Sequence, residues 1–218
     1  MWCQIIEMNE KICYYAIKSK RGDMVSKQLA CMVTDFLLRE KVIEQEDREI
    51  YHYGYEMLFS GILQSFLLLA VGWVVGKIVV TVVFVVVFVT LRCYTGGYHA
   101  SSRMGCVITT LLVYFFVLCQ CTKGIPLYKE LANLILLIAF YGIIFICYAP
   151  IEHERKPLSK EQKIQNKRRG GVLSVIYSII AILLYKEIIS ISISIVITMV
   201  CVALLMIIQK GGTKEVGT

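Results

Sequence analysis

Residues 77–91 read KIVVTVVFVVVFVTL, with a single charged side chain at the first position. By propensity, a run so rich in valine and phenylalanine could form a buried strand. Five further apolar runs lie at 57–73, 105–121, 131–149, 171–185 and 188–208. A bilayer crossing needs about 20 mainly apolar residues, and a helix satisfies all of its own backbone groups in lipid. The six runs therefore predict an all-α, polytopic membrane protein with six transmembrane helices.

The composition and the placement of charge agree with this fold class. The chain of 218 residues is 57% hydrophobic, has a mean hydropathy of +0.68 and is only 18% charged, against about a quarter in soluble domains. Lysine and arginine gather on the cytoplasmic side of membrane proteins. An inside N-terminus leaves four basic residues outside (Lys77, Lys123, Lys129 and Lys186) and the other nineteen of 23 inside. Both termini and the segments 92–106 and 150–170 are therefore predicted to be cytoplasmic.

Three regions are expected along the chain. Residues 1–55 are amphipathic, with apolar side chains at helical spacing in 2–12 and 25–36. We expect helices at the membrane surface there, which either cover the bundle or help to capture a substrate or a second subunit. Residues 56–210 form the transmembrane domain, and 211–218 form a short cytoplasmic tail.

The polar gap 92–106, RCYTGGYHASSRMGC, holds a histidine and a cysteine that could act together. An imidazole can take the proton of a thiol, and the resulting thiolate attacks carbonyls. In one continuous helix His99 and Cys106 would lie roughly 10 Å apart along the axis, too far for a proton transfer over about 3 Å. The pair therefore requires a turn. Gly96-Gly97 can end the preceding helix and Ser101 can cap the next one, which would place Cys106 near a helix N-terminus beside Arg103.

Other roles for these residues remain open. Arg92 could bind a carboxylate or mark the lipid boundary, and the glycines could supply oxyanion donors or form a plain turn. Zinc is a further alternative, because several possible ligands are predicted near the cytoplasmic face: His52, Cys93, His99, Cys106 and His153. None of the usual paired-ligand spacings is present, so the sequence favours a site without metal or cofactor.

The spaced motif Arg92-x4-Gly97-x-His99-x6-Cys106, set between two apolar runs, resembles the accessory gene regulator protein B (AgrB) family. The segments 51–61 (YHYGYEMLFSG) and 148–163 (YAPIEHERKPLSKEQK) are similar to that family as well. The resemblance implies a multi-pass cysteine endopeptidase in the cell membrane of a Gram-positive bacterium, with its active site on the cytoplasmic side.

What the resemblance implies for the chemistry is specific. The substrate would be an AgrD-like propeptide, whose acidic C-terminal tail is removed through a thioester on the enzyme. A cysteine or serine of the propeptide would then close a thiolactone or lactone ring, giving an autoinducing peptide. Cys106 would be the nucleophile and His99 the general base and acid, while Arg92 and Gly97 would orient the site, helped by Gly96, Ser101 and Arg103. The family also implies a homodimer, and no nucleic acid partner is expected.

The segment 150–170 carries seven basic side chains: Arg155, Lys156, Lys160, Lys163, Lys167, Arg168 and Arg169. They could contact anionic lipid headgroups, at about 1 kcal/mol each near the surface, or dock the acidic tail of the propeptide. A small transporter or a scaffold without covalent chemistry is the competing function. Transporters place ionisable residues inside their spans, and the six apolar runs nearly lack them. Neither alternative would need His99 or Cys106.

Overall fold

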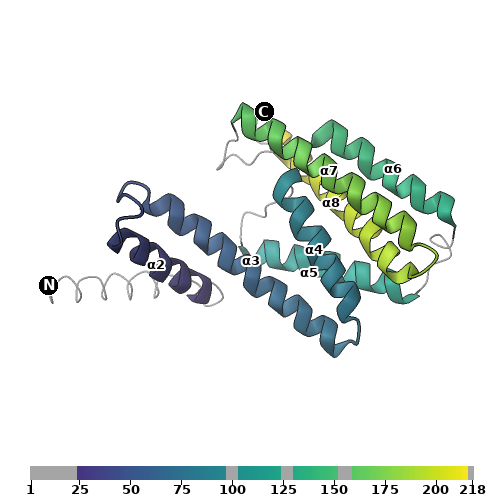
Figure 1. Ribbon diagram of the computed structural model, residues 1–218, viewed down its shortest axis with the longest axis horizontal. Helices are drawn as coiled ribbons and strands as arrows, with labels where there is room; N and C mark the ends of the chain where they lie inside the picture. Colours follow the sequence, from purple (N-terminus) through teal and green to yellow (C-terminus); the bar gives the residue numbers. More distant parts are fainter. Residues whose placement is uncertain (1–23, 97–102, 124–129, 152–158, 216–218) are drawn as a thin grey trace. The chain divides into compact units, whose positions relative to one another are not determined.

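The computed structural model describes residues 24–96, 103–123, 130–151 and 159–215, and the regular structure in these segments is entirely α-helical (Figure 1). The helices are α2 (Met24–Arg39), α3 (Arg48–Val74), α4 (Ile78–Thr95), α5 (Arg103–Lys123), α6 (Leu131–Tyr148), α7 (Lys160–Leu184) and α8 (Ile189–Glu215). The prediction of an all-α fold is confirmed, and the valine-rich run 77–91 lies in α4. The helix expected within 2–12 falls outside the described residues.

Five helices are long and apolar enough to cross a membrane, namely α3, α4, α5, α6 and α8. They correspond to five of the six expected spans, so the chain is a multi-pass membrane protein. The remaining expected span, 171–185, is the second half of α7. The first half of α7 carries lysine and arginine, because the helix begins well before its apolar part.

The chain divides into two compact units, Met1–Leu67 and Leu68–Thr218, with the boundary inside α3. In the first unit, Arg48 at the start of α3 forms an ion pair with Asp35 of α2 at 2.9 Å. The buried face of α2 consists of small side chains, among them Ala30 and Thr34. The predicted apolar stripe of α2 is present but exposed, with Met32 69% exposed and Phe36 51% exposed.

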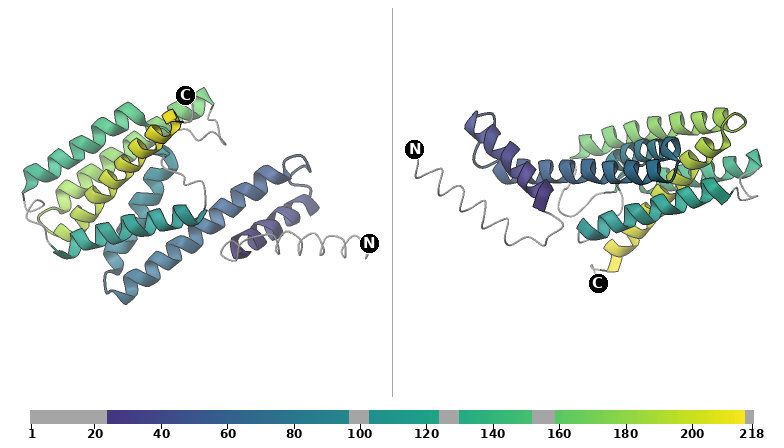
Figure 2. Two further views of the ribbon diagram at one scale, coloured as in Figure 1. Left: turned by 180° about the vertical axis from the view of Figure 1, so that it is seen from behind. Right: turned by 90° about the horizontal axis from the view of Figure 1, so that it is seen from below.

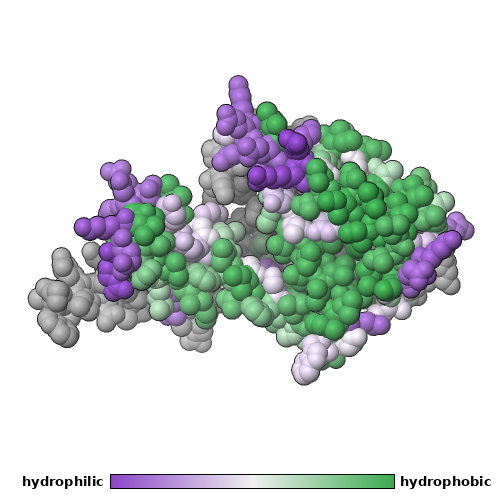
Figure 3. All heavy atoms as spheres, viewed as in Figure 1, coloured by the Kyte–Doolittle hydropathy of each residue, from purple (hydrophilic) through white to green (hydrophobic). Residues whose placement is uncertain are grey.

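Helix α8 lies at the centre of the second unit, where it contacts α4, α5, α6 and α7 (Figure 2). Of the residues in its most apolar stretch, 72% are buried inside the protein. The core contains large buried side chains of α4 (Phe84 and Leu91), α5 (Tyr114 and Val117), α6 (Leu134 and Tyr141) and α8 (Met199 and Met206). The outward faces of α4, α5, α6 and α7 are rich in exposed valine, isoleucine, leucine and phenylalanine, as expected for lipid-facing helices (Figure 3).

Hydroxyl groups link the helices of this unit. Thr90 of α4 and Tyr177 of α7 share a hydrogen bond of 2.8 Å, and the hydroxyls of Tyr141 (α6) and Ser174 (α7) lie at the same distance. Ser192 of α8 donates to the carbonyl oxygen of Ala181 at 2.7 Å. Apolar side chains gain little by leaving lipid for a neighbouring helix, so such bonds and close packing stabilise a bundle in the membrane. These bonds hold α7 against α4, α6 and α8.

Candidate active site

The last turn of α4 and the first turn of α5 bring Arg92 and Cys106 together. Leu91 and Thr95 are buried and fix this end of α4 in the core. Arg92 lies half-buried on another side, with its guanidinium 5.4 Å from the ring centroid of Phe88, a cation–π distance. From there one of its terminal nitrogens points at the Sγ atom of Cys106, 3.8 Å away. Arg92 was expected either to bind a carboxylate or to mark the lipid boundary. In the structure its guanidinium lies beside the Cys106 thiol.

Cys106 is the fourth residue of α5 and is half-buried. The first four N–H groups of a helix have no partner within the helix, and they carry the positive end of its dipole. The carbonyl oxygen of Cys106 accepts a hydrogen bond from the Thr110 hydroxyl at 3.0 Å, and the Cys106 thiol lies beside Arg92. Cys106 thus lies in the first turn of α5 beside Arg92, whereas the sequence predicted Arg103 as its cationic neighbour.

Several of the predicted site residues cannot be placed. His99, Gly97 and Ser101 lie in 97–102, outside the described residues, and the side chain of Arg103 is likewise not described. Helix α4 ends at Thr95, and the described part of α5 runs from Arg103 to Lys123. The pairing of His99 with Cys106 remains a prediction.

Gly96 ends α4 in a backbone conformation that only glycine adopts readily, with φ 72° and ψ −153°. It also approaches the start of the segment 150–170 very closely, because a Cβ atom at Gly96 would collide with the carbonyl oxygen of Ile151. Beside this contact, the Ile151 N–H donates to the carbonyl oxygen of Thr95 at 2.9 Å. The two polar segments predicted on the cytoplasmic side are thus joined through backbone atoms at their first residues.

The first turns of α7 lie at the same end of the second unit. Ser159 begins α7 with a capping box, in which its Oγ accepts from the Gln162 N–H and its own N–H donates to Gln162 Oε1. Gly170 is buried, and a Cβ there would lie 3.2–3.3 Å from the Phe145 ring and from the Cβ of Tyr94. This glycine therefore allows α7 to pack closely on α4 and α6.

The described members of the basic segment occupy the first three turns of α7. Lys167 donates to the carbonyl oxygen of Ile146 on α6 at 3.3 Å, so it serves helix packing. Arg168 and Arg169 are exposed, and they line a cleft of about 550 Å³ together with Gln165, Val172, Leu173 and Tyr94 of α4. Lys160 lies about two turns, and Lys163 about one and a half turns, nearer the start of the helix. Arg155 and Lys156 fall outside the described residues.

The sequence did not single out Tyr94, Ile151 or Gly170 as parts of this region. For Ile151 no residue-type signal exists, because its backbone makes the contact. Gly170 belongs to the glycine pair 170–171, and Tyr94 lies two residues before the pair 96–97; glycine pairs are a signal for close backbone approach.

Other thiols and possible metal ligands are less suited to the chemistry. Burial and the Asp35 carboxylate raise the pKa of the Cys31 thiol, against the opposing effect of Arg48. Cys93 and Cys147 are exposed at the ends of α4 and α6. In the part of the chain that the structure describes, no three His, Cys, Asp or Glu side chains are grouped closely enough to hold a metal ion.

Comparisons with known proteins place these residues in a family context. The family described as Accessory gene regulator B matches residues 30–207, a range that contains the whole polar gap and the basic segment. An AgrB-like protein of Clostridium perfringens (strain 13) is 26% identical over 165 residues, which cover 71% of this chain and 74% of that protein. No solved structure matches the chain.

Proposed function

Because the chain belongs to the accessory gene regulator B family, which acts in quorum-sensing peptide processing, we propose that it is a membrane-embedded cysteine endopeptidase for an AgrD-type propeptide. The observation that carries this proposal is the Arg92 guanidinium 3.8 Å from the half-buried Cys106 Sγ, at the N-terminal turn of α5. A cation and a helix N-terminus are the surroundings in which cysteines act as nucleophiles.

In the first step, the Cys106 sulfur attacks the carbonyl carbon of the bond that precedes the propeptide's C-terminal tail. His99 takes the thiol proton as the new S–C bond forms. The C–N bond then breaks, and the departing amine of the tail receives that proton from the imidazolium. The products are a thioester on Cys106 and a free tail. This step requires His99 to lie within about 3 Å of Sγ in the substrate complex.

In the second step, a thiol or hydroxyl inside the propeptide attacks the thioester carbonyl. His99 accepts its proton, the Cys106 sulfur leaves, and the proton returns to Cys106 to regenerate the enzyme. The product is a cyclic thiolactone or lactone. Holding both reacting groups on one chain replaces a bimolecular reaction by an intramolecular one, and a half-buried thiol at the lipid boundary limits competing attack by water.

The outer part of the basic segment suits the acidic tail. Lys160 and Lys163 precede the apolar half of α7 by several turns, so they extend toward the aqueous phase, where a polar tail would depart. We place Arg155 and Lys156 in the same role on sequence grounds. We further propose a homodimer in the cell membrane of a Gram-positive bacterium, with the active site on the cytoplasmic side.

The test is intact mass spectrometry of the full-length protein in liposomes with its propeptide. We expect the wild type to carry an adduct equal in mass to the propeptide without its tail, and Cys106→Ala and His99→Ala to carry none. Cys93→Ala, which removes an exposed thiol at the end of α4, is the matched control and should behave as wild type. Tail release that persists in Cys106→Ala would refute Cys106 as the nucleophile. A wild type that forms no adduct and releases no tail would refute the peptidase and leave transport or scaffolding.

A further inference from the structure

The cleft between α4 and α7 has an amphipathic lining. At its polar end lie Arg168 and Arg169 with Gln165, and at its apolar end lie Val172 and Leu173. Neither arginine has a carboxylate partner among the described residues. The space of about 550 Å³ is within the range of small-molecule sites, ~300–1,000 Å³. The lining therefore fits a ligand with an anionic head and an apolar body.

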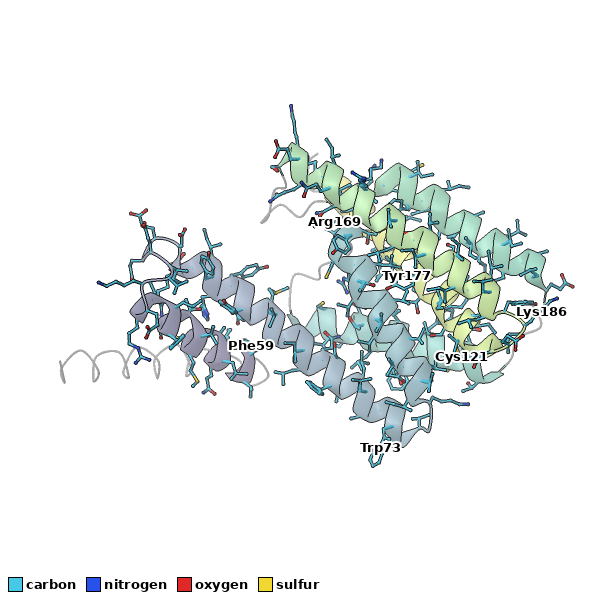
Figure 4. All side chains as sticks on the ribbon, in the orientation of Figure 1. Phe59, Trp73, Cys121, Arg169, Tyr177 and Lys186 are labelled. Carbon is cyan, nitrogen blue, oxygen red and sulfur yellow. The ribbon has the colours of Figure 1, made fainter. Side chains whose placement is uncertain are left out.

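The length of the uncharged part of α7 indicates at which level of the bilayer the cleft lies. This helix contacts α4, α6 and α8, each of which is long enough to cross the membrane. Its own uncharged stretch, between Arg169 and Lys186, has sixteen residues, or about 24 Å of helix. The hydrocarbon core is about 30 Å thick, which is longer than this stretch. A span shorter than the core thins the bilayer locally and brings the lipid headgroups closer to the ends of the helix. Arg169 and Lys186 lie at opposite ends of this stretch (Figure 4), so Arg169 reaches the level of the lipid phosphates.

An exposed apolar stripe continues from the cleft along α7. Val172 is 54% exposed, Ile176 43% and Ile179 52%, and their spacing of three to four residues puts them on one helix face with Arg168 and Arg169. Figure 3 shows the same change on the face in view, with hydrophilic atoms over the start of α7 and mainly hydrophobic atoms along the helices beyond it. A molecule held by its head at the arginines would lay its tail on this stripe.

The cleft lies away from the Cys106 thiol. Tyr94 faces α7, whereas Arg92 faces Cys106, and two residues correspond to about 200° around a helix. The thickness of α4, roughly 10 Å, separates the two. An acidic peptide bound at Cys106 would have to pass around α4 to reach the cleft, so the position favours a lipid over the substrate.

We propose that this cleft binds an anionic phospholipid, with its phosphate on Arg168 and Arg169 and its acyl chain along Val172 and Ile176. Basic pockets between helices on the cytoplasmic side are a known setting for such headgroups. The proposal does not depend on the peptidase chemistry. It divides the basic segment by depth: Lys160, eight residues before Arg168, lies about 12 Å farther along the helix axis.

The test is native mass spectrometry of the full-length protein in detergent, titrated with phosphatidylglycerol or phosphatidylcholine. We expect the wild type to retain one phosphatidylglycerol about tenfold or more tightly than phosphatidylcholine. Arg168→Gln with Arg169→Gln should weaken phosphatidylglycerol about 30-fold, equivalent to about 1 kcal/mol for each basic side chain. Arg168→Lys with Arg169→Lys keeps the charge and should retain most of the binding.

The matched control is Lys160→Gln with Lys163→Gln, which removes the same charge outside the cleft and should change binding less than twofold. An equal loss in both neutralised pairs would overturn the proposal, because net charge alone would then decide. Lack of preference for phosphatidylglycerol, or displacement of it by glycerol phosphate or by an acidic peptide at similar concentration, would overturn it as well. Cys106→Ala should bind lipid as the wild type does, so the site and the peptidase can fail separately.

Discussion

Replacing Gly96 by alanine should disable the catalytic segment with little effect on the rest of the bundle. At φ 72° and ψ −153° a residue with a Cβ is strained by about 1–3 kcal/mol. In addition, the new methyl group would collide with the carbonyl oxygen of Ile151, so the start of the segment 97–102 must move by roughly 1 Å. A misplacement of that size near reacting groups can cost on the order of 100-fold in rate. We therefore expect adduct formation to slow by about two orders of magnitude.

Gly76 supplies a matched control. It also has a positive φ, 70°, but no atom lies within 4 Å of the position its Cβ would take. Gly76→Ala should lower the free energy of unfolding by roughly 1–2 kcal/mol through the backbone alone, at the other end of α4. The assay is the single-turnover rate of adduct formation, measured by quenched-flow mass spectrometry, beside denaturant unfolding of both variants.

The reasoning fails if Gly96→Ala forms the adduct within about twofold of the wild-type rate. It also fails if both alanine variants slow the reaction equally, since general destabilisation would then account for the effect. A slow Gly96→Ala beside a normal Gly76→Ala, at similar unfolding free energies, would assign the effect to the contact with Ile151.

Two further predictions concern charged neighbours of thiols. Arg92→Gln should slow adduct formation about 10- to 100-fold, because a hydrogen bond to a charged group contributes about 1.5–3 kcal/mol, and Arg92→Lys should recover part of the rate. The second concerns Cys31, whose pKa is raised by burial and by Asp35. The contribution of the neutral Cys31 thiol to the stability of the folded protein is complete below the usual thiol pKa. It is lost as the pH rises through the raised pKa. Maleimide should label Cys31 more slowly than the exposed Cys93 near pH 8, and Asp35→Asn should accelerate the labelling, as read by peptide mapping.

The apolar runs predicted the helices well because burial in lipid requires a long uncharged segment whatever its neighbours are. The run 77–91, which could have been a strand in water, forms α4. The start of α7 was harder to predict. Hydropathy finds where a helix enters the membrane, whereas α7 begins at a capping box, Ser159-x-x-Gln162, twelve residues before its apolar half. Reading that motif would have placed the basic residues on a helix.

The candidate site was predicted in part. Residue chemistry pointed to Cys106 with Arg103 as the nearby cation, whereas the structure places the guanidinium of Arg92 beside Cys106. The contact of Gly96 with Ile151 could not be predicted, because it joins backbone atoms 55 residues apart and leaves no trace in side-chain type. A glycine pair indicates a close approach, but only the packing of α4 and α6 on α7 and α8 determines which backbone atoms meet there.

The placement of the basic residues along α7 is the basis of our proposal that they have two roles, an alternative that the sequence left open. In the sequence alone, the seven basic residues of the segment 150–170 cannot be assigned to different partners, since both lipid headgroups and an acidic tail attract them. On a helix that enters the bilayer each residue lies about 1.5 Å deeper than the one before. In the proposed arrangement Arg168 and Arg169 contact lipid phosphates, while Lys160 lies in the aqueous phase, where it can contact the propeptide. If both roles are real, neutralising the outer lysines should raise the propeptide's KM and leave lipid retention unchanged, and neutralising the inner arginines should do the reverse.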